Sequence, residues 1–177
     1  MTAESRLLAE AFVNDPLMAY FWPDAARRVR ALPLFWHARV EARRRAGIVD
    51  TVSDGDGLAA VVLWEQPGIS PPMAKPFSLI RSLGVAAPRA LAASGRIEKL
   101  RPATPHLYVA VAATAARARG KRLVSELLRA RIAAADSDVF AVATNPASVA
   151  VAEHMGFRAT GDLPIGAAVL RGMLLSK

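Results

Sequence analysis

The chain has 177 residues, of which 53% are hydrophobic and 21% are charged. This length and balance suit one compact domain and exclude disordered and collagen-like classes. The absence of cysteine excludes disulfides, thiolate zinc sites and a cysteine nucleophile, and it fits a reducing cytoplasm. The start of the chain carries Glu4 and Glu10 and lacks the pattern of a signal peptide, and the longest uncharged run, residues 102–116, is too short to span a bilayer. We therefore expect a cytoplasmic protein without a membrane segment.

The formal net charge is +8, and arginine supplies nearly all the positive charge. A basic chain attracts anions such as nucleic acid, anionic lipid or a phosphate-rich cofactor, and a solvated arginine surface is the alternative. No zinc finger and no aromatic RNA-binding signature is present. Nucleic acid is therefore not the expected partner.

Two helices are expected before residue 47. The first has apolar residues at helical spacing, at Leu7, Leu8, Ala11 and Phe12. It ends at the turn signal Asn14-Asp15-Pro16, which an aromatic segment, Leu17–Pro23, follows. The second helix is expected over Asp24–Ala46, with Gly47 as its stop.

The second expected helix has one apolar stripe and several arginine-bearing faces. The stripe consists of Val29, Leu32, Trp36 and Val40. The arginines are Arg27, Arg28, Arg30, Arg39 and Arg43 to Arg45. Pro33 should kink or split this helix, because proline removes one helical donor and crowds the preceding turn.

The middle of the chain predicts a hairpin and then a helical insertion. Two strands, Ile48–Val52 and Leu58–Trp64, are joined by the hairpin signal Asp54-Gly55-Asp56-Gly57. A loop with four prolines, Gln66–Pro76, is long enough to suggest that it covers something. Short helices are expected over roughly 77–84 and 88–100.

The second half alternates strand and helix. Strands are expected over 106–112, 138–143, 157–161 and 169–174, with helices over 119–135 and 145–156. Asn145-Pro146 offers a helix cap followed by proline at the first helical position. This order indicates an α/β fold with a sheet of mixed strand direction.

Two motifs of this half have a specific order and spacing. The strand His106-Leu107-Tyr108-Val109 precedes a helix that opens with Arg119-Gly120-Lys121-Arg122-Leu123-Val124, and Asn145 stands eleven residues before Gly156-Phe157. Together they resemble the signatures of the GNAT superfamily of acetyl-CoA-dependent N-acetyltransferases. The resemblance implies a mixed, mostly antiparallel sheet flanked by helices. It also implies one domain over 1–177, comprising first helices and strands (1–65), an insertion (66–105) and the cofactor-binding core (106–177).

The resemblance implies a cofactor site at the start of the 119–135 helix, where free N–H groups and the helix dipole hold a diphosphate. The residues concerned are Arg119, Gly120, Lys121, Arg122, Leu123 and Val124. Backbone groups near Ala112 and Thr114 would hold the pantetheine arm, and Asn145 and Ser148 would add contacts, although Asn145 is also a helix cap. Arg122 and Val124 stand where the family prefers small residues. Arg122 either binds phosphate, fills the phosphate site or points to water.

The chemistry implied by the resemblance is direct attack of a neutral amine on the acetyl thioester, without a metal. Two residues of this mechanism are replaced, because Ala152 stands at the tyrosine position that protonates the thiolate and Val142 at a glutamate position. Candidate catalytic replacements are Tyr108, His106 and Glu153, each of which has an ordinary structural alternative. Glu65 is a further candidate base, with a solvated strand end as its alternative.

Three hypotheses about the function of the protein follow from these observations. The leading one is an acetyl-CoA-dependent N-acetyltransferase acting on a small-molecule amine or a peptide N-terminus, as a monomer or homodimer. The second is a GNAT-like binding or regulatory protein that has lost catalysis and binds coenzyme A weakly or not at all. The third is a nucleic-acid-associated protein. Phe21, Trp22, Phe35 and Trp36 either line an apolar acceptor pocket or belong to the core.

Overall fold

The computed structural model describes residues 1–177 and contains one six-stranded sheet in the order β1-β2-β3-β4-β6-β5. The strands are β1 (Ile48–Asp54), β2 (Gly57–Glu65), β3 (Leu107–Thr114), β4 (Val139–Ala143), β5 (Arg158–Ile165) and β6 (Ala168–Leu175). Only β3 and β4 pair in parallel; all other neighbours are antiparallel. The expected mixed, mostly antiparallel α/β fold is therefore confirmed.

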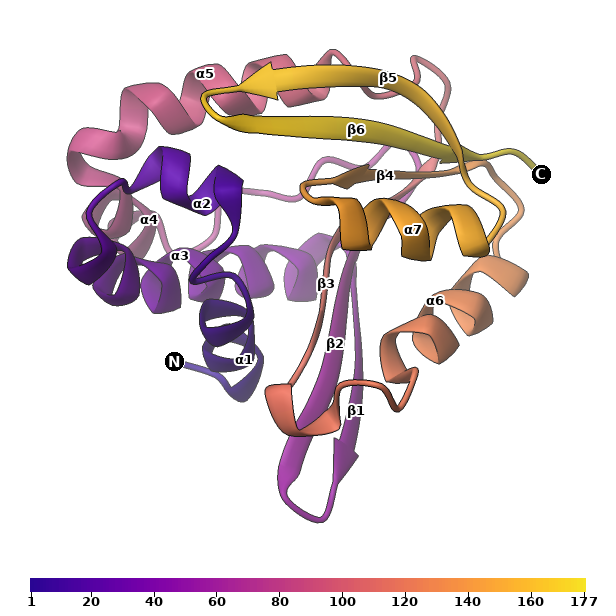
Figure 1. The fold of residues 1–177 in the computed structure, drawn as a ribbon, viewed down its shortest axis with the longest axis horizontal. Coiled ribbons are helices and arrows are strands. Elements are labelled where there is room, and N and C mark those ends of the chain that lie inside the picture. Colours follow the sequence, from indigo (N-terminus) through magenta and orange to yellow (C-terminus); the bar gives the residue numbers. More distant parts are fainter.

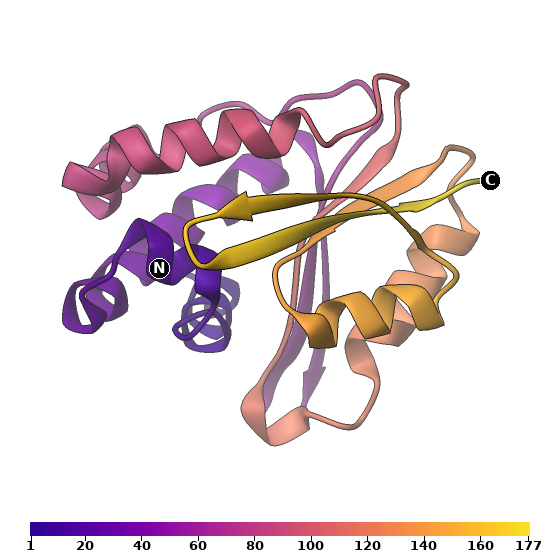
Figure 2. The ribbon, with the colours of Figure 1, turned by 45° about the horizontal axis from the view of Figure 1, so that its top comes forward.

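Seven helices flank this sheet (Figures 1 and 2). They are α1 (Ala3–Ala11), α2 (Pro16–Phe21), α3 (Ala25–Ala46), α4 (Pro76–Leu83), α5 (Ala87–Glu98), α6 (Leu123–Ala133) and α7 (Pro146–His154). The first five gather beside one face of the sheet, and α6 and α7 lie on the other side. No helix combines the length and apolar character that a membrane crossing requires.

The long helix α3 runs unbroken through Pro33, so the expected split is wrong. A proline removes the donor that would satisfy the carbonyl four residues earlier, and that carbonyl belongs to Val29, whose side chain is 57% exposed. Water can reach this turn, which lowers the cost of the missing bond. Val29 therefore leaves the expected apolar stripe, while Leu32, Trp36 and Val40 are buried.

Helix α2 lies in the aromatic segment, where the sequence pattern predicts no helix. Asp15 caps it by accepting hydrogen bonds from the N–H groups of Leu17 (3.0 Å) and Met18 (3.2 Å). Pro16 stands at the first helical position, where a proline costs nothing. A cap and a proline at the first position are thus sufficient to start a helix of six residues.

Strand β3 contains a β-bulge at the point where its pairing with β4 ends. Along β2, Leu63 pairs with Val111 and its neighbour Trp64 pairs with Val109, so that Ala110 is an extra residue in a β-bulge. Strand β4 pairs with β3 only through three residue pairs, of which the last is Val109 with Ala141. Beyond the bulge the two strands run apart, as Figure 1 shows.

Helix α6 begins at Leu123, four residues later than the sequence predicts. Gly120 (φ +82°) and Arg122 (φ +59°) both have the left-handed backbone conformation, which a right-handed helix excludes. Residues 119–122 therefore form a tight turn that leads into the helix rather than its first turn.

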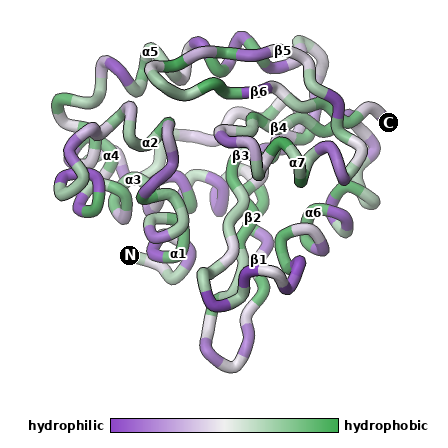
Figure 3. The backbone as a smooth tube through the Cα atoms, in the orientation of Figure 1, coloured by the Kyte–Doolittle hydropathy of each residue, from purple (hydrophilic) through white to green (hydrophobic).

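Two apolar cores pack on opposite sides of the sheet. The larger contains residues of α1–α5 with Val61, Leu63, Val111 and Ala113, and the smaller contains residues of α6 with Val62, Trp64 and Leu107. Strand β2 contributes to both cores because its side chains alternate between the faces and all are buried from Ala59 onward. Figure 3 shows the resulting hydrophobic course of β2.

Gly47 offers a test of how closely α3 packs on the sheet. A Cβ atom at this position would lie 2.5 Å from the backbone oxygen of Trp64, so one element must move. We expect Gly47→Ala to lower the free energy of unfolding by about 1–3 kcal/mol. Gly55→Ala is the matched control, because nothing lies within 4 Å of a Cβ there. Urea denaturation of both variants measures the difference, and equal midpoints would contradict the close packing.

Candidate functional site

A cavity of about 920 Å³ lies where β3 and β4 separate. Its walls come from both sides of the sheet: the strands β3 and β4, the helices α6 and α7, and the helices α2, α3 and α5. One end reaches the turn at Gly120, and the other reaches Arg39 and Tyr108. The cavity therefore joins an anion-attracting helix start to a partly apolar chamber.

The bulge determines which backbone groups of β3 face this cavity. The N–H of Leu107 donates to Asp138 on the β4 side (2.9 Å), whereas the N–H of Ala115 donates to Ala59 on β2 (2.8 Å). The backbone N–H groups of odd-numbered residues thus point toward β4 before Ala110 and toward β2 after it, because the extra residue of the bulge inverts the alternation. Consequently the N–H and C=O groups of Ala112 and Thr114 point away from β2, toward the space that β4 has left.

The start of α6 supplies unpaired donors and positive charge at one end of the cavity. No side chain caps this helix, so the N–H groups of its first turn are free to bind an anion. The cavity is lined by Arg119, Gly120, Arg122, Leu123 and Val124, but not by Lys121. The basic side chains Arg119, Lys121 and Arg122 are exposed and belong to none of the ion pairs of the structure.

Helix α7 begins at the cavity with a complete capping box. Asn145 Oδ1 accepts from the N–H of Ser148 (3.0 Å), and Ser148 Oγ accepts from the N–H of Asn145 (3.3 Å). Asn145 is therefore a helix cap, as the sequence predicts, and both residues also line the cavity. Ala152 and Val142 line it too, so the positions at which the family carries tyrosine and glutamate face the same space here.

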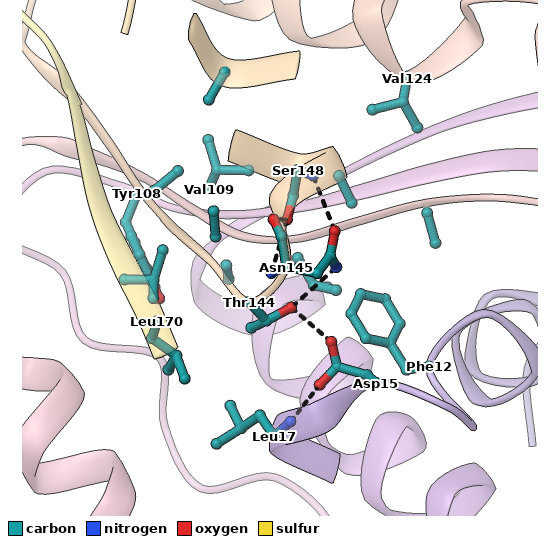
Figure 4. Close-up of a pocket in the computed structure, with 18 of the residues that line it drawn as sticks. Phe12, Asp15, Leu17, Tyr108, Val109, Val124, Thr144, Asn145, Ser148 and Leu170 are labelled. Atoms are coloured by element: carbon teal, nitrogen blue, oxygen red, sulfur yellow. Dashed lines mark hydrogen bonds between the residues drawn. The ribbon is translucent and has the colours of Figure 1, made fainter. Parts of the chain in front are cut away.

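Asp15 is a site residue that the sequence did not reveal. Its carboxylate accepts a hydrogen bond from Thr144 Oγ1 (2.6 Å), and Asn145 Nδ2 donates to the same threonine oxygen (3.4 Å) (Figure 4). This chain of contacts fastens α2 to the junction of β4 and α7. Burial raises the pKa of Asp15, although its hydrogen bonds oppose the shift. The motif Asn14-Asp15-Pro16 indicated only a turn, because the hydrogen-bond partner of Asp15, Thr144, lies 129 residues further along the chain.

Glu65 is buried, so the expected alternative of a solvated strand end is wrong. Only 6% of the residue is exposed, and its carboxylate lies between two guanidinium groups. Arg43 pairs with one oxygen, and Arg101 Nη1 donates to the other at 2.9 Å. With both oxygens engaged by arginines, Glu65 connects α3, β2 and the segment after α5.

Tyr108 lies beside this cluster and lines the cavity. The guanidinium carbon of Arg101 is 4.2 Å from the centre of the Tyr108 ring, and Phe140 stacks beside the ring at 6.1 Å. Burial, together with the charge of Glu65, raises the pKa of the Tyr108 hydroxyl. Tyr108 therefore offers a protonated hydroxyl to the cavity at neutral pH.

His106 and Glu153, the other two candidate catalytic residues, do not line the cavity. His106 is buried, with Nδ1 2.8 Å from the carbonyl oxygen of Thr104 and Nε2 accepting from Arg101 (3.3 Å). These contacts hold both ring nitrogens within the protein. Glu153 is exposed on α7. Of the three candidates, the structure brings only Tyr108 to the cavity.

The four aromatic residues of the N-terminal half are all buried in the core. Phe21, Phe35 and Trp36 also line the cavity, whereas Trp22 does not. The Trp22 indole instead donates to the carbonyl of Ser82 (3.0 Å), which anchors α4. Phe21, Phe35 and Trp36 therefore belong both to the core and to the cavity wall, whereas Trp22 belongs to the core alone. No cluster of His, Cys, Asp or Glu side chains is arranged to hold a metal ion.

A sheet that opens after a bulge, beside an uncapped helix start, defines the acyl-CoA N-acyltransferase class of fold. The fold of the chain is that of the GNAT superfamily. It is similar to a structure from Corynebacterium glutamicum described as histone acetyltransferase HPA2 and related acetyltransferase, with 27% identity, a TM-score of 0.76, and coverage of 97% of this chain and 87% of that one. No family sequence model and no curated protein sequence matches the chain.

More distant structures share the fold at low identity. A GNAT-family acetyltransferase from Streptococcus agalactiae is 12% identical, with a TM-score of 0.59 over 97% of this chain and 87% of that one. A structure described as an insect putative arylalkylamine N-acetyltransferase 7, from the yellow fever mosquito Aedes aegypti, is 17% identical, with a TM-score of 0.59 over 98% of this chain and 81% of that one.

Arg122 stands where the family pattern prefers a small residue, and its backbone is left-handed (φ +59°), a conformation that glycine adopts readily. A left-handed residue with a side chain costs roughly 1–2 kcal/mol, and a cation at a helix start is also unfavourable. We expect Arg122→Gly to be more stable than Arg122→Ala by about 1 kcal/mol, since both variants lack the guanidinium and only glycine tolerates this φ without strain. Thermal unfolding of the pair measures the difference; greater stability of the alanine variant would contradict the strain.

Asp15 predicts a pH dependence of stability. Because its pKa is raised in the folded protein, folding is penalised by its ionisation, and this penalty develops as the pH rises from the ordinary value of 3.8 through the raised pKa. Asp15→Asn keeps the cap on α2 and removes the penalty. We expect the variant to gain stability relative to wild type as the pH rises over this window, measured by urea denaturation. Asp24→Asn, at the exposed cap of α3, is the control, and equal profiles for Asp15→Asn and wild type would contradict the shift.

Proposed function

We propose that the protein is an acetyl-CoA-dependent N-acetyltransferase for a small-molecule amine or a peptide N-terminus. The observation that supports this best is that one cavity contains the open edge of β3, at Ala112 and Thr114, and the uncapped start of α6. An acyl-CoA has an amide-bearing arm, which an open strand edge suits, and a diphosphate, which a helix start suits. The residues present therefore fit this group.

In this proposal the first turn of α6 binds the diphosphate through backbone N–H groups, supported by Arg119, Lys121 and Arg122. The N–H groups of Ala112 and Thr114 hydrogen-bond the pantetheine arm, and Asn145 and Ser148 border it. Leu123 and Val124 contribute main-chain donors. When bound, acetyl-CoA supplies the activated acetyl group.

The reaction forms a bond between the amine nitrogen and the acetyl carbon and breaks the bond from that carbon to sulfur. The amine nitrogen loses one proton and the thiolate gains one, so the protons balance. The products are an N-acetyl amide and the free thiol. Tyr108 is the side chain we propose as proton donor to the thiolate, because it is the one of the three candidates that lines the cavity. Asp15 also lines the cavity and contacts Thr144 just before α7, which makes it a candidate to accept the amine's proton through water.

The replacements Val142 and Ala152 limit the rate rather than exclude the reaction. A positioned acid or base contributes about 10²–10⁴-fold, whereas bringing the reactants together contributes up to about 10⁵–10⁸ M in effective concentration. The alternative is that the chain binds coenzyme A weakly or not at all and acts as a binding or regulatory protein. Arg122 and Val124 motivate that alternative.

Calorimetric titration with acetyl-CoA and with desulfo-CoA tests the cofactor site. We expect binding of both ligands and at least about a tenfold loss of affinity in Lys121→Glu, because a carboxylate there repels the diphosphate. Arg129→Glu is the matched control, since Arg129, like Lys121, is exposed and lies outside the cavity lining, but it stands further along α6, away from the first turn.

Turnover with a panel of amines then separates the two functions. Acetyl transfer that Lys121→Glu slows and Arg129→Glu leaves unchanged would support the enzyme. Binding of both ligands without transfer to any amine would support the regulatory alternative. Absence of binding would overturn the acetyltransferase and leave the alternative, which binds coenzyme A weakly or not at all.

A further inference from the structure

The end of the cavity away from α6 contains an arginine without a counterion. Arg39 projects from α3 and lines the cavity, yet it belongs to none of the ion pairs of the structure. Its guanidinium lies 5.6 Å from the centre of the Phe35 ring. Arg43, one turn further along the helix, is instead buried and paired with Glu65.

Arg39 is exposed and lines the cavity, so its guanidinium can meet a ligand group there. The surrounding protein, together with the charge of Arg43, lowers the pKa of Arg39 to about 10, so that it stays charged at neutral pH. A guanidinium without a carboxylate partner in the protein is free to pair with an anion. The site therefore favours a negatively charged ligand group.

The charges around Arg39 indicate how much negative charge would fit. Arg39, Arg43 and Arg101 face two carboxylates, Glu65 and Glu98, of which Glu65 contacts two of the arginines and Glu98 contacts Arg101 at 3.3 Å. One positive charge is left over, and it belongs to Arg39. A monoanion balances this group, whereas a dianion would be repelled by the two glutamates.

The other walls at this end define the rest of the ligand. Phe35, Trp36 and Phe12 are apolar. The fork of the Arg39 guanidinium suits the two oxygens of a carboxylate. The coenzyme's own phosphates are not expected here, because α3 and α6 pack against opposite sides of the sheet.

We propose that the acceptor is an amine carrying a carboxylate, which pairs with Arg39 while an apolar or aromatic body contacts Phe35 and Trp36. This inference rests on the proposed acetyltransferase function. It makes Arg39 a specificity-determining residue: the ion pair forms with the ground state and the transition state alike, so its loss raises KM more than it lowers kcat.

Matched amines with and without a carboxylate test the proposal. The pairs are phenylalanine and phenethylamine, tryptophan and tryptamine, and 4-(aminomethyl)benzoate and benzylamine, which vary the spacing between amine and carboxylate. We expect wild type to favour the carboxylate member of at least one pair by about 30-fold or more in kcat/KM, the size expected for a desolvated charge pair. In Arg39→Gln the preference should fall to within about threefold through a rise in KM, while the amine without a carboxylate keeps its kcat/KM. Arg39→Lys should retain part of the preference.

Arg45→Gln is the matched control, because Arg45 lies on the same helix, is exposed and does not line the cavity. It should leave the preference unchanged. Arg39→Gln should fold with wild-type thermal stability, since it breaks no ion pair. Equal kcat/KM for both members of every pair in wild type, or a preference that survives Arg39→Gln, would overturn the proposal.

Direct binding distinguishes failure of this inference from failure of the proposed function. Each pair is also titrated calorimetrically into the protein in the presence of desulfo-CoA, which needs no turnover. Tighter binding of the carboxylate members that disappears in Arg39→Gln supports the anion site even if no amine is acetylated. Acetylation without any carboxylate preference overturns the anion site and leaves the acetyltransferase intact.

Discussion

The separation of β3 from β4 is the constraint on which the rest of the structure depends. Three residue pairs hold the two strands together, and the bulge at Ala110 then inverts the alternation of β3 while β4 continues beside β6. Buried backbone groups need partners, and those of Ala112 and Thr114 have lost theirs on one edge. The unpaired edge is the reason why the chain maintains a cavity that an extended, amide-bearing ligand can complete.

Some of the arginines form ion pairs with carboxylates of the protein, and others do not. Arg43 and Arg101 are paired with Glu65 at the end of β2, and Arg131 is paired with Asp50. These pairs fasten helices and the insertion to the first strands. Among the cationic residues that line the cavity, Arg39 at one end and Arg119 and Arg122 at the start of α6 belong to no ion pair.

Sequence patterns predicted what depends on local or periodic information. The strands, most helices, the cap at Asn145 and the order of the α/β elements follow from hydrophobic spacing and turn chemistry. The burial of Glu65, the Asp15–Thr144 contact and the isolation of Arg39 depend on which segments meet in space, and no local pattern specifies that. The continuity of α3 through Pro33 likewise depends on the exposure of Val29, a property of the packed helix.

Arg122 shows how such a site can lose residue identities and keep its geometry. The family pattern carries a small residue there, and the φ of +59° is one that glycine adopts without strain. The turn at 119–122 still leads into the start of α6 at the cavity. The donors at this start and on β3 are main-chain atoms, which do not depend on side-chain identity. The side chains at positions 142 and 152 differ from the family pattern, whereas the main-chain groups that we propose to bind acetyl-CoA are present.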